Sequence, residues 1–534
     1  WQFITACNGK GCVCIAWCSI MNEKAETIGP LGVIDVGAHS MRLEIVQPHD
    51  GEFEPLEDLS YPVPLGRDVF LDGKIHIENA SLVERILKDF SRVLDEYNVR
   101  HCTAVATSAV REAQNRDMFL DRIRQRTSID LQLLEGPEEI RLIYLAVADA
   151  LKSRHPITSG SSIIYTIGTG SSQLCFLKDG QMQHADTIRL GTLRLVEEQL
   201  DEKLSPKRLN EIVDPFVAEM LSGVARMSPD VTPERLIAVG APVRGLLALD
   251  RSRMPAKVGT ISRDRFEDLF AELSGKSDAE LVKVYGLPDT VAKSMEPCCH
   301  MLEHLFEITQ APRLEIPMIN TRDALAEDMV RRIKGDPDPF IPHILSSARA
   351  LGERYRYDAD HARNVSRHVT ALFDELKELH ALPDRWRLLL AVAAEIHDIG
   401  LFISGRGHHK HSYYLVRNSM IPGISAAEQE LLGVLVRYHR KAMPKASHLE
   451  YTSLMPDRRV EVSKAAAILR VADALDRSHR GKIRSLHAKV EPKRVTLRVS
   501  APGDLTFERW GLSRKGDLFE EVFGHRVILA PAGA

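Results

Sequence analysis

Apolar and polar residues follow each other along the first part of the chain in patterns that alternate between strand and helix. Residues 31–46, LGVIDVGAHSMRLEIV, combine an apolar run, a turn at Gly37 and an alternating stretch, which predicts a β-hairpin. The periodicity then predicts a helix over 80–97, a strand over 103–107 and a helix over 139–151. This alternation indicates an α/β lobe with a mixed sheet.

A second segment repeats the first hairpin. Residues 163–176, IIYTIGTGSSQLCF, carry the same spacing of Gly, Ser and Leu as residues 31–46, a weak internal repeat with the period of about one lobe. Further helices are predicted over 205–221 and 263–281, with a strand over 236–239 between them. The chain up to about residue 320 therefore predicts two α/β lobes.

The pattern changes at residues 335–342, GDPDPFIP, where proline and aspartate end a helix. Helical patterns then follow one another from 344 to 479, and alternating stretches within 483–527 predict a small tail that contains strands. The predicted class is α/β plus all-α. The predicted segments are an extension, expected to be disordered, over 1–28, lobes over 29–155 and 156–335, a helical domain over 336–480 and an α+β subdomain over 481–534.

Composition narrows the class of protein. A chain of 534 residues exceeds one ordinary core, and 44% hydrophobic with 27% charged residues is typical of soluble globular domains. No apolar run approaches the roughly 20 residues that cross a bilayer, which argues against a membrane protein. With 70 Lys+Arg against 74 Asp+Glu, a protein that coats nucleic acid is disfavoured, so an anionic ligand must be held by a local site.

Cysteines crowd the start of the chain. Cys7, Cys12, Cys14 and Cys18 all precede Met21, and their spacing lacks the two CxxC pairs of a typical zinc site. We interpret residues 1–20 as an upstream extension or processing remnant, with a metal-binding tract as the less favoured alternative.

The repeated hairpin suits phosphate chemistry. Gly in the turn allows the main chain to come within hydrogen-bond distance of an anion, and Asp35 in the entering strand offers a carboxylate. A single hairpin with Gly and Ser is more often only a turn. The recurrence of the pattern favours the functional interpretation.

With this hairpin and several further segments, the sequence resembles the Ppx/GppA family of exopolyphosphatases and guanosine pentaphosphatases. The first hairpin is similar to the family's D-x-G-S-N-S-x-R-L motif, and residues 106–115, ATSAVREAQN, to its arginine-bearing segment. Residues 135–147, EGPEEIRLIYLAV, resemble its catalytic glutamate helix, and GTLRL at 191–195 also matches. The agreement runs from residue 31 through the tail. The resemblance implies two actin-like (RNase H-like) ASKHA lobes, followed by a helical HD-type domain and a small α+β tail.

The resemblance also implies an activity. It predicts a cytoplasmic hydrolase acting on acid anhydrides, in which water attacks a terminal phosphoryl group of inorganic polyphosphate or guanosine pentaphosphate (pppGpp) with Mg²⁺ or Mn²⁺. A homodimer is expected, with no membrane and no specific nucleic acid as partner. Glu139 would be the general base, with Asp35 and Arg111 as the other principal residues. The phosphate-binding candidates are Gly37, Ser40, Arg42, Gly168, Gly170 and Ser171.

Residue chemistry is compatible with these roles. A carboxylate near a helix start and partly desolvated, as Glu139 is expected to be, can have its pKa moved toward neutrality. Arg111 can bind phosphate in a bidentate manner. The alternative for Glu139 is a solvated residue that complements the helix dipole.

The sequence departs from the family pattern at several positions. Thr166 and Gln173 stand where the family has Asp and Glu, and both carboxylates are expected to help hold Mg²⁺. Ala38 and His39 replace Ser and Asn in the first motif, and residues 240–243, GAPV, replace a glycine-rich turn. The resemblance therefore leaves open how the lobes hold a metal.

The helical region carries the H, HD, D pattern of HD phosphohydrolases. Imidazole and carboxylate ligands from separate helices can converge there on one or two divalent metals. His408 and His409 are expected to be exposed loop residues or substrate contacts instead. The candidate metal ligands are His361, His397, Asp398, His411, His439 and Asp473.

Three functional hypotheses follow. The first places phosphoanhydride hydrolysis between the two lobes. The second makes the helical domain an HD-type, metal-dependent phosphohydrolase, with the lobes sensing a phosphorylated ligand or alarmone. The third is a sensor of polyphosphate or an alarmone in which neither site turns over, and tight binding without hydrolysis would distinguish it.

Overall fold

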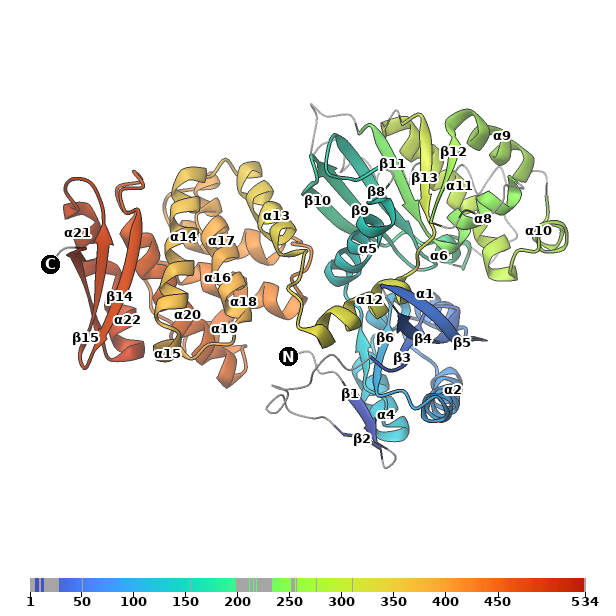
Figure 1. Cartoon of the computed structure of the whole chain (residues 1–534), viewed down its shortest axis with the longest axis horizontal. Coiled ribbons are helices and arrows are strands. Elements are labelled where there is room, and N and C mark those ends of the chain that lie inside the picture. Colours follow the sequence, from blue (N-terminus) through green and yellow to red (C-terminus); the bar gives the residue numbers. More distant parts are fainter. Residues whose placement is uncertain are drawn as a thin grey trace. The chain divides into compact units, whose positions relative to one another are not determined.

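The structure, a computed structural model, describes residues 5–8, 11–13, 28–49, 51–153, 155–197, 211, 215, 218, 233–250, 255, 257–274, 276–309 and 311–532. It divides into two compact units, Trp1–Pro339 and Phe340–Ala534 (Figure 1). Most of the extension predicted over 1–28 and most of the helix predicted over 205–221 lie outside the described residues. Within these ranges, no helix combines the length and apolar character needed to cross a bilayer.

The first lobe is built on a seven-stranded sheet with the order β2-β1-β6-β3-β4-β5, with β7 beside β6. Its strands are β1 (Thr5–Asn8), β2 (Gly11–Val13), β3 (Leu31–Val36), β4 (Ser40–His49), β5 (Glu52–Pro62), β6 (His101–Ala106) and β7 (Leu131–Leu133). Its helices are α1 (Leu65–Asp72), α2 (Ile77–Glu96), α3 (Ser108–Glu112), α4 (Arg116–Thr127) and α5 (Gly136–Leu151). Because β3 pairs antiparallel with β4 and parallel with β6, the predicted mixed sheet is confirmed.

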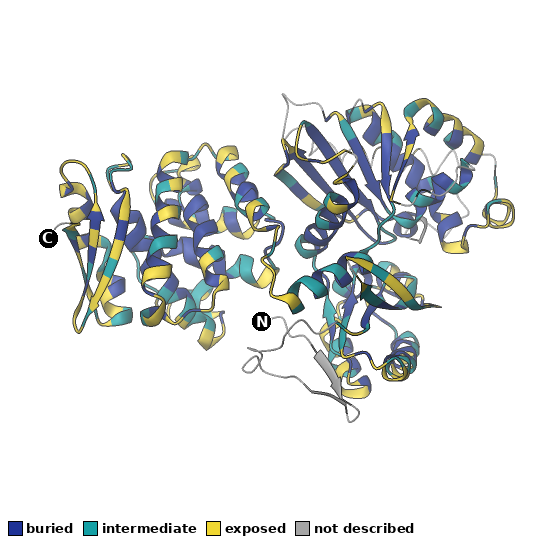
Figure 2. Ribbon diagram, viewed as in Figure 1, coloured by how far each residue is buried: buried dark blue, intermediate teal, exposed yellow. Residues whose placement is uncertain are grey.

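The core of this lobe follows from the hydrophobic periodicity of its elements. Helix α2 buries Val83, Leu87, Phe90 and Leu94, which recur at helical spacing and form one apolar stripe. Strand β3 is buried over almost its whole length because helices cover both faces of the sheet, as the dark ribbons of Figure 2 show. Apart from Asp35, the sequence of the strand is therefore a run of glycine and apolar residues rather than an alternation of apolar and polar ones.

The second lobe has a six-stranded sheet with the order β10-β9-β8-β11-β13-β12. Its strands are β8 (Ser161–Ile167), β9 (Ser172–Lys178), β10 (Gln181–Ile188), β11 (Arg235–Val239), β12 (Val258–Ser262) and β13 (Arg313–Pro317). Its helices are α6 (Thr192–Glu197), α8 (Ala241–Leu249), α9 (Arg263–Leu273), α10 (Asp278–Tyr285), α11 (Asp289–Thr309) and α12 (Thr321–Lys334). The single helix predicted over 263–281 is wrong: Ser277 and Glu280 form a capping box that starts α10 as a separate helix.

Helices α5 and α12 pack against each other and connect the two lobes. Helix α5 contacts β9 and β10 of the second sheet, whereas α12 contacts β3, β4 and β6 of the first. At their contact the buried Arg141 pairs with Glu138 at 2.8 Å, Asp328 at 2.7 Å and Asp338 at 3.2 Å. This ionic network fixes the helix that carries Glu139.

The second unit is a set of helices followed by a small sheet. The helices are α13 (Ile341–Arg354), α14 (Ala359–Glu375), α15 (Lys377–His380), α16 (Arg385–Ile396), the 3₁₀ helix η1 (Ile399–Phe402), α17 (His408–Arg417), α18 (Ala426–Arg437), α19 (Leu449–Thr452) and α20 (Pro456–Leu475). The tail holds β14 (Ser485–Glu491), β15 (Arg494–Ser500), α21 (Thr506–Lys515), α22 (Asp517–Phe523) and β16 (Arg526–Pro531). Helices α21 and α22 pack on α20, so the tail shares the core of this unit.

Candidate functional site

The two hairpins place equivalent residues at the same register. Asp35 on β3 lies opposite Arg42 on β4, and Thr166 on β8 lies opposite Gln173 on β9. The internal repeat read from the sequence is therefore a structural repeat. Thr166 therefore occupies the position that corresponds to Asp35, and Gln173 the position that corresponds to Arg42.

The turns of the two hairpins are built alike. The Gly37 N–H donates to the Ser40 carbonyl at 2.9 Å, and the Gly168 N–H donates to the Ser171 carbonyl at 3.1 Å. A Cβ on Gly168 would lie 2.5 Å from that carbonyl oxygen. Glycine is therefore required by the tightness of the turn.

A cleft within the first unit gathers the residues that the sequence predicted for the lobes. All of them except Arg111 line it, and elements from both lobes contribute. Its polar and glycine lining comprises Asp35, Gly37, His39, Ser40, Arg42, Thr107, Ser108, Glu139, Thr166, Gly168, Thr169, Gly170, Ser171, Gly240, Arg244, Thr290, Ser294, Asn320, Thr321 and Arg322.

Glu139 is held in the first turn of α5 by two neighbours. Gln173 Nε2 donates to Glu139 Oε2 at 2.9 Å, and Arg111 Nη1 lies 3.6 Å from the same oxygen. Burial raises the pKa of Glu139, and the charge of Arg111 opposes part of that rise. A carboxylate with a raised pKa in a cleft is suited to accept a proton from water.

Arg111 contacts Glu139 rather than the open cleft. Its guanidinium donates to the Leu134 carbonyl and, at 3.2 Å, to Ser171 Oγ. The bidentate contact with phosphate that the sequence suggested for Arg111 stays a prediction. The observed contacts favour a positioning role for Arg111 on Glu139.

Asp35 is the residue best placed to hold a cation in the cleft. Its Oδ1 atom is buried and has no hydrogen-bond partner among the residues that the structure describes. Burial raises the pKa of Asp35, while the charges of Arg322 and Arg42 act in the opposite direction. In the described part of the lining, Asp35 and Glu139 are the carboxylates. Mg²⁺ commonly uses one or two carboxylates plus substrate phosphates, so the residues present fit a single divalent cation.

Two arginines that sequence reasoning missed also line the cleft. Arg244 donates to the Ile319 carbonyl at 2.6 Å, and Arg322 Nε lies 2.7 Å from Glu44 Oε2. Together with Arg42 they bring positive charge to the walls, which suits a polyanionic ligand. No local motif marks Arg244 or Arg322, because only the packing of α8 and α12 brings them to the hairpins.

The turn at Gly240 starts helix α8 at the edge of the cleft. Gly240 has φ of 154°, and a Cβ there would lie 2.5 Å from the Ile167 carbonyl oxygen. Pro242 stands in the first turn of α8, where a helix tolerates the missing N–H. Because proline has no N–H, this turn offers one backbone donor fewer than a glycine-rich turn would.

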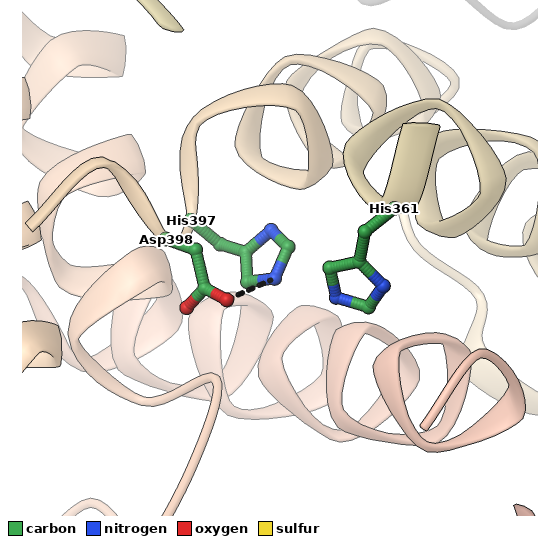
Figure 3. Close-up of side chains that lie close together, drawn as sticks. All are labelled: His361, His397 and Asp398. Carbon is green, nitrogen blue, oxygen red and sulfur yellow. Dashed lines mark ion pairs between the residues drawn. The ribbon is translucent and has the colours of Figure 1, made fainter. Parts of the chain in front are cut away.

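A second group of candidate residues lies in the helical unit. His361 comes from α14, His397 and Asp398 from the end of α16, and their ligand atoms converge (Figure 3). Asp473 from α20 lies 3.6 Å from His361 Nε2. The structure thus brings together the four residues of the pattern that the sequence identified.

His408, and not His411, joins these residues. His408 and His409 are 4% and 6% exposed, so the expectation that they are exposed loop residues is wrong. Gly407, with φ of 77°, turns the chain so that α17 begins at His408 with this side chain facing inward. His408 Nε2 lies 3.1 Å from Asp398 Oδ1, whereas the partly exposed His411 is absent from both groups of candidate ligands found in the described residues.

Two family models match this chain. A family model described as the Ppx/GppA phosphatase family matches residues 44–333, and one described as Ppx/GppA phosphatase, domain III, matches residues 345–512.

Relatives and a solved structure extend the match. The guanosine-5'-triphosphate,3'-diphosphate pyrophosphatase of Aliivibrio fischeri strain ES114 is 24% identical over 84% of this chain and 87% of its own. The protein of the same name from Pseudoalteromonas translucida is 24% identical over 82% and 86%. An exopolyphosphatase structure from Cytophaga hutchinsonii has a TM-score of 0.51 at 21% identity, covering 58% of this chain and 99% of that one, which shows a shared fold.

Proposed function

The chain belongs to the Ppx/GppA phosphatase family, and on that basis we propose that its cleft hydrolyses the terminal phosphoanhydride bond of pppGpp or inorganic polyphosphate. The names of the pyrophosphatase relatives and of the exopolyphosphatase structure support these substrates. The observation that carries the proposal is the buried Glu139, held at the cleft by Gln173 and Arg111.

In this proposal the two hairpin turns bind the terminal phosphates. Ser40 and Ser171 offer hydroxyl donors, and Arg42, Arg244 and Arg322 neutralise phosphate charge. A divalent cation, Mg²⁺ or Mn²⁺, held through Asp35 would supply further charge neutralisation and polarise the phosphoryl group. The cleft thereby positions a phosphate chain before any proton moves.

Glu139 accepts the proton of the attacking water. The water oxygen forms a bond to the terminal phosphorus, and the bond from phosphorus to the bridging oxygen breaks in line with it. The products are inorganic phosphate and a chain or nucleotide one phosphate shorter. Arg111 and Gln173 keep the Glu139 carboxylate oriented throughout.

Release of phosphate by the intact protein tests this function directly. With Mg²⁺ or Mn²⁺ present, we expect inorganic phosphate from pppGpp or from polyphosphate. Tight binding of both compounds without any release would contradict the proposal and support the sensor hypothesis instead.

Arg42 is expected to act on substrate binding. Arg42→Met should raise KM roughly 10- to 100-fold with a smaller change in kcat, since a hydrogen bond to a charged group contributes about 1.5–3 kcal/mol. Steady-state kinetics of the variant against Arg67→Met, an exposed arginine of α1 outside the cleft lining, provide the comparison. An unchanged KM in Arg42→Met would remove this residue from the binding surface.

Gln173 is expected to limit the affinity for the cation. Gln173→Glu places a second carboxylate beside Glu139, so the Mg²⁺ concentration for half-maximal activity should fall by about 10-fold or more. Gln173→Met, which removes the amide without adding a charge, should not lower it. Equal Mg²⁺ dependence of the wild type and Gln173→Glu would place the cation elsewhere.

A further inference from the structure

Two buried histidines of the helical unit have their protonation fixed by backbone carbonyls. His397 Nδ1 lies 2.8 Å from the Ala394 carbonyl oxygen, and His439 Nδ1 lies 2.7 Å from the Val436 carbonyl oxygen. A carbonyl oxygen only accepts hydrogen bonds, so each Nδ1 carries the proton. In the neutral ring the Nε2 atom of each histidine therefore presents a lone pair.

Both lone pairs point at a carboxylate. His439 Nε2 lies 3.2 Å from Asp398 Oδ1, and His397 Nε2 lies 3.6 Å from Asp398 Oδ2. His397 is 1% exposed, and its Nε2 has no hydrogen-bond partner among the described residues. Lone pairs that face each other in a buried site are unfavourable, and a cation between them reverses the sign of the interaction.

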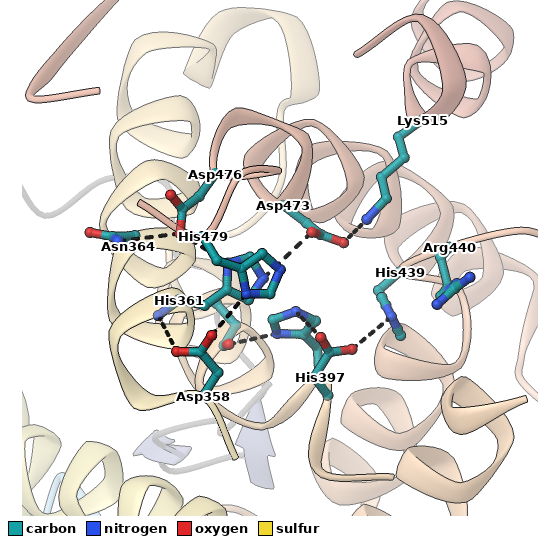
Figure 4. Close-up of polar contacts among 12 residues, drawn as sticks. Asp358, His361, Asn364, His397, His439, Arg440, Asp473, Asp476, His479 and Lys515 are labelled. Atoms are coloured by element: carbon teal, nitrogen blue, oxygen red, sulfur yellow. Dashed lines mark hydrogen bonds and ion pairs between the residues drawn. The ribbon is translucent and has the colours of Figure 1, made fainter. Parts of the chain in front are cut away.

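His361 repeats this arrangement with a carboxylate in place of the carbonyl. Its Nδ1 lies 2.9 Å from Asp476 Oδ2, which leaves Nε2 directed toward Asp473, 3.6 Å away (Figure 4). A carboxylate that orients the far side of an imidazole is typical of metal-binding histidines. The first group of candidate ligands is His361, His397 and Asp398.

His408 completes a second group around the same aspartate. Its Nε2 lies 3.1 Å from Asp398 Oδ1 and 3.2 Å from His439 Nε2. The ligand atoms of Asp398, His408 and His439 all lie within 4.8 Å of one another, as do those of the first group. Asp398 is thus common to both groups.

We propose that the helical unit holds two divalent cations bridged by Asp398, and that this centre binds a phosphate group. His361 and His397 serve one cation, with Asp473 adjacent to them, and His408 and His439 serve the other. The imidazole ligands favour Fe²⁺ or Zn²⁺ over Mg²⁺, and the carboxylate of Asp398 also suits Mn²⁺. This site is separate from the cleft of the lobes and does not depend on its activity.

Two basic side chains flank the proposed cations and supply the phosphate contacts. Lys515, at the end of α21, forms an ion pair with Asp473, and Arg440 Nη1 lies 3.1 Å from His408 Nε2 (Figure 4). Nε of the buried Arg470 donates to the backbone carbonyl of Lys515 at 3.1 Å, which fixes the main chain at Lys515. The C-terminal subdomain thereby contributes a residue to the site, and a phosphate bound to the cations would meet the positive charges of Lys515 and Arg440.

Cation content is the test of the metal centre. The full chain and its variants are stripped of metal, loaded with Mn²⁺ and dialysed, and bound Mn²⁺ is counted per chain. We expect Asp398→Asn to lose two Mn²⁺ relative to the wild type, and His408→Ala to lose one. His411→Ala, three residues along the same helix, is the matched control and should lose none.

Because each variant is compared with the wild type, a cation in the lobe cleft does not affect the differences. The electron paramagnetic resonance spectrum should show a coupled pair of Mn²⁺ ions that His408→Ala abolishes. Equal Mn²⁺ content in the wild type, His408→Ala and Asp398→Asn, with folding checked by circular dichroism, would overturn the proposal. Loss of cation from His411→Ala but not from His408→Ala would overturn the assigned ligands.

Inorganic phosphate tests the anion part of the proposal. Added phosphate should change the spectrum of the Mn²⁺-loaded wild type and of Arg514→Met, whose exposed side chain lies over Trp510. Lys515→Met should keep its Mn²⁺ and require at least about 10-fold more phosphate for the same change, the loss expected for one charge-assisted hydrogen bond. An identical phosphate response in the wild type and Lys515→Met would remove Lys515 from the site.

Discussion

Glu139→Gln is expected to lower phosphate release from pppGpp or polyphosphate by about 10²- to 10⁴-fold, the usual contribution of a positioned general base. Glutamine keeps the shape of the side chain but cannot accept the proton of the attacking water. The buried position of Glu139 and its contact with Gln173 make it the carboxylate suited to this role. The loss should appear in kcat, with KM changed much less.

Asp149→Asn provides the matched control for this prediction. Asp149 is exposed on the same helix, α5, and does not line the cleft. The Asp149→Asn variant should therefore release phosphate as fast as the wild type. Initial rates of phosphate release from the three proteins decide the matter. A Glu139→Gln variant within a factor of about two of the wild type would exclude the general-base role.

Arg141→Met is expected to lower the free energy of unfolding of the first unit by about 3–5 kcal/mol, as breaking a buried ion pair usually does. Arg141 is 4% exposed and contacts Glu138, Asp328 and Asp338. Its removal leaves the buried Asp328 with less compensation at the contact between α5 and α12. Denaturant unfolding followed by a probe in the first unit measures the change.

The loss of unfolding free energy caused by Arg141→Met should depend on pH. Burial alone would raise the pKa of Asp328, but the charges of Arg141 and Arg332 more than offset it and hold the pKa below its ordinary value of 3.8. Stability gained from this carboxylate is therefore present above 3.8 and is lost as the pH falls through the lower pKa of the folded state. The difference between the wild type and Arg141→Met should shrink in that acidic range.

The control is Arg332→Met, which removes the same charge from a partner of Asp328 that is more exposed than Arg141. Arg332 also pairs with Asp328, at 2.5 Å, but its side chain is 35% exposed, so its loss should cost about 1 kcal/mol or less. Equal destabilisation by Arg332→Met and Arg141→Met would contradict the role given to burial.

Local patterns were sufficient to predict the architecture of the lobes. The hairpins at β3 and β8 were readable because apolar runs, a glycine turn and alternation all fall within short windows. Helices α2 and α5 were predicted within a few residues of their ends by their periodicity. The break between α9 and α10 was missed, although the polar and turn-forming residues 274–278, SGKSD, interrupt the apolar spacing between Leu273 and Leu281, and the Ser277 capping box starts the second helix.

The candidate site was predictable where a motif spans it and not where packing creates it. Asp35 and Glu139 were found from their motifs, whereas Arg244 and Arg322 reach the cleft from elements distant in sequence. His408 was overlooked in favour of His411, because the sequence does not show that α17 begins at His408. Which histidine faces inward depends on where that helix starts.

Hydrolysis in water labelled with ¹⁸O is the measurement that tests the central claim most directly. The full chain is incubated with pppGpp and a divalent cation, and the position of the label is determined by mass spectrometry. Attack on the terminal phosphorus predicts label in the released inorganic phosphate, an unlabelled nucleotide one phosphate shorter, and almost no product from Glu139→Gln. Label in the nucleotide, or labelled phosphate formed equally well by Glu139→Gln, would contradict the assignment of this cleft as the phosphoanhydride hydrolase.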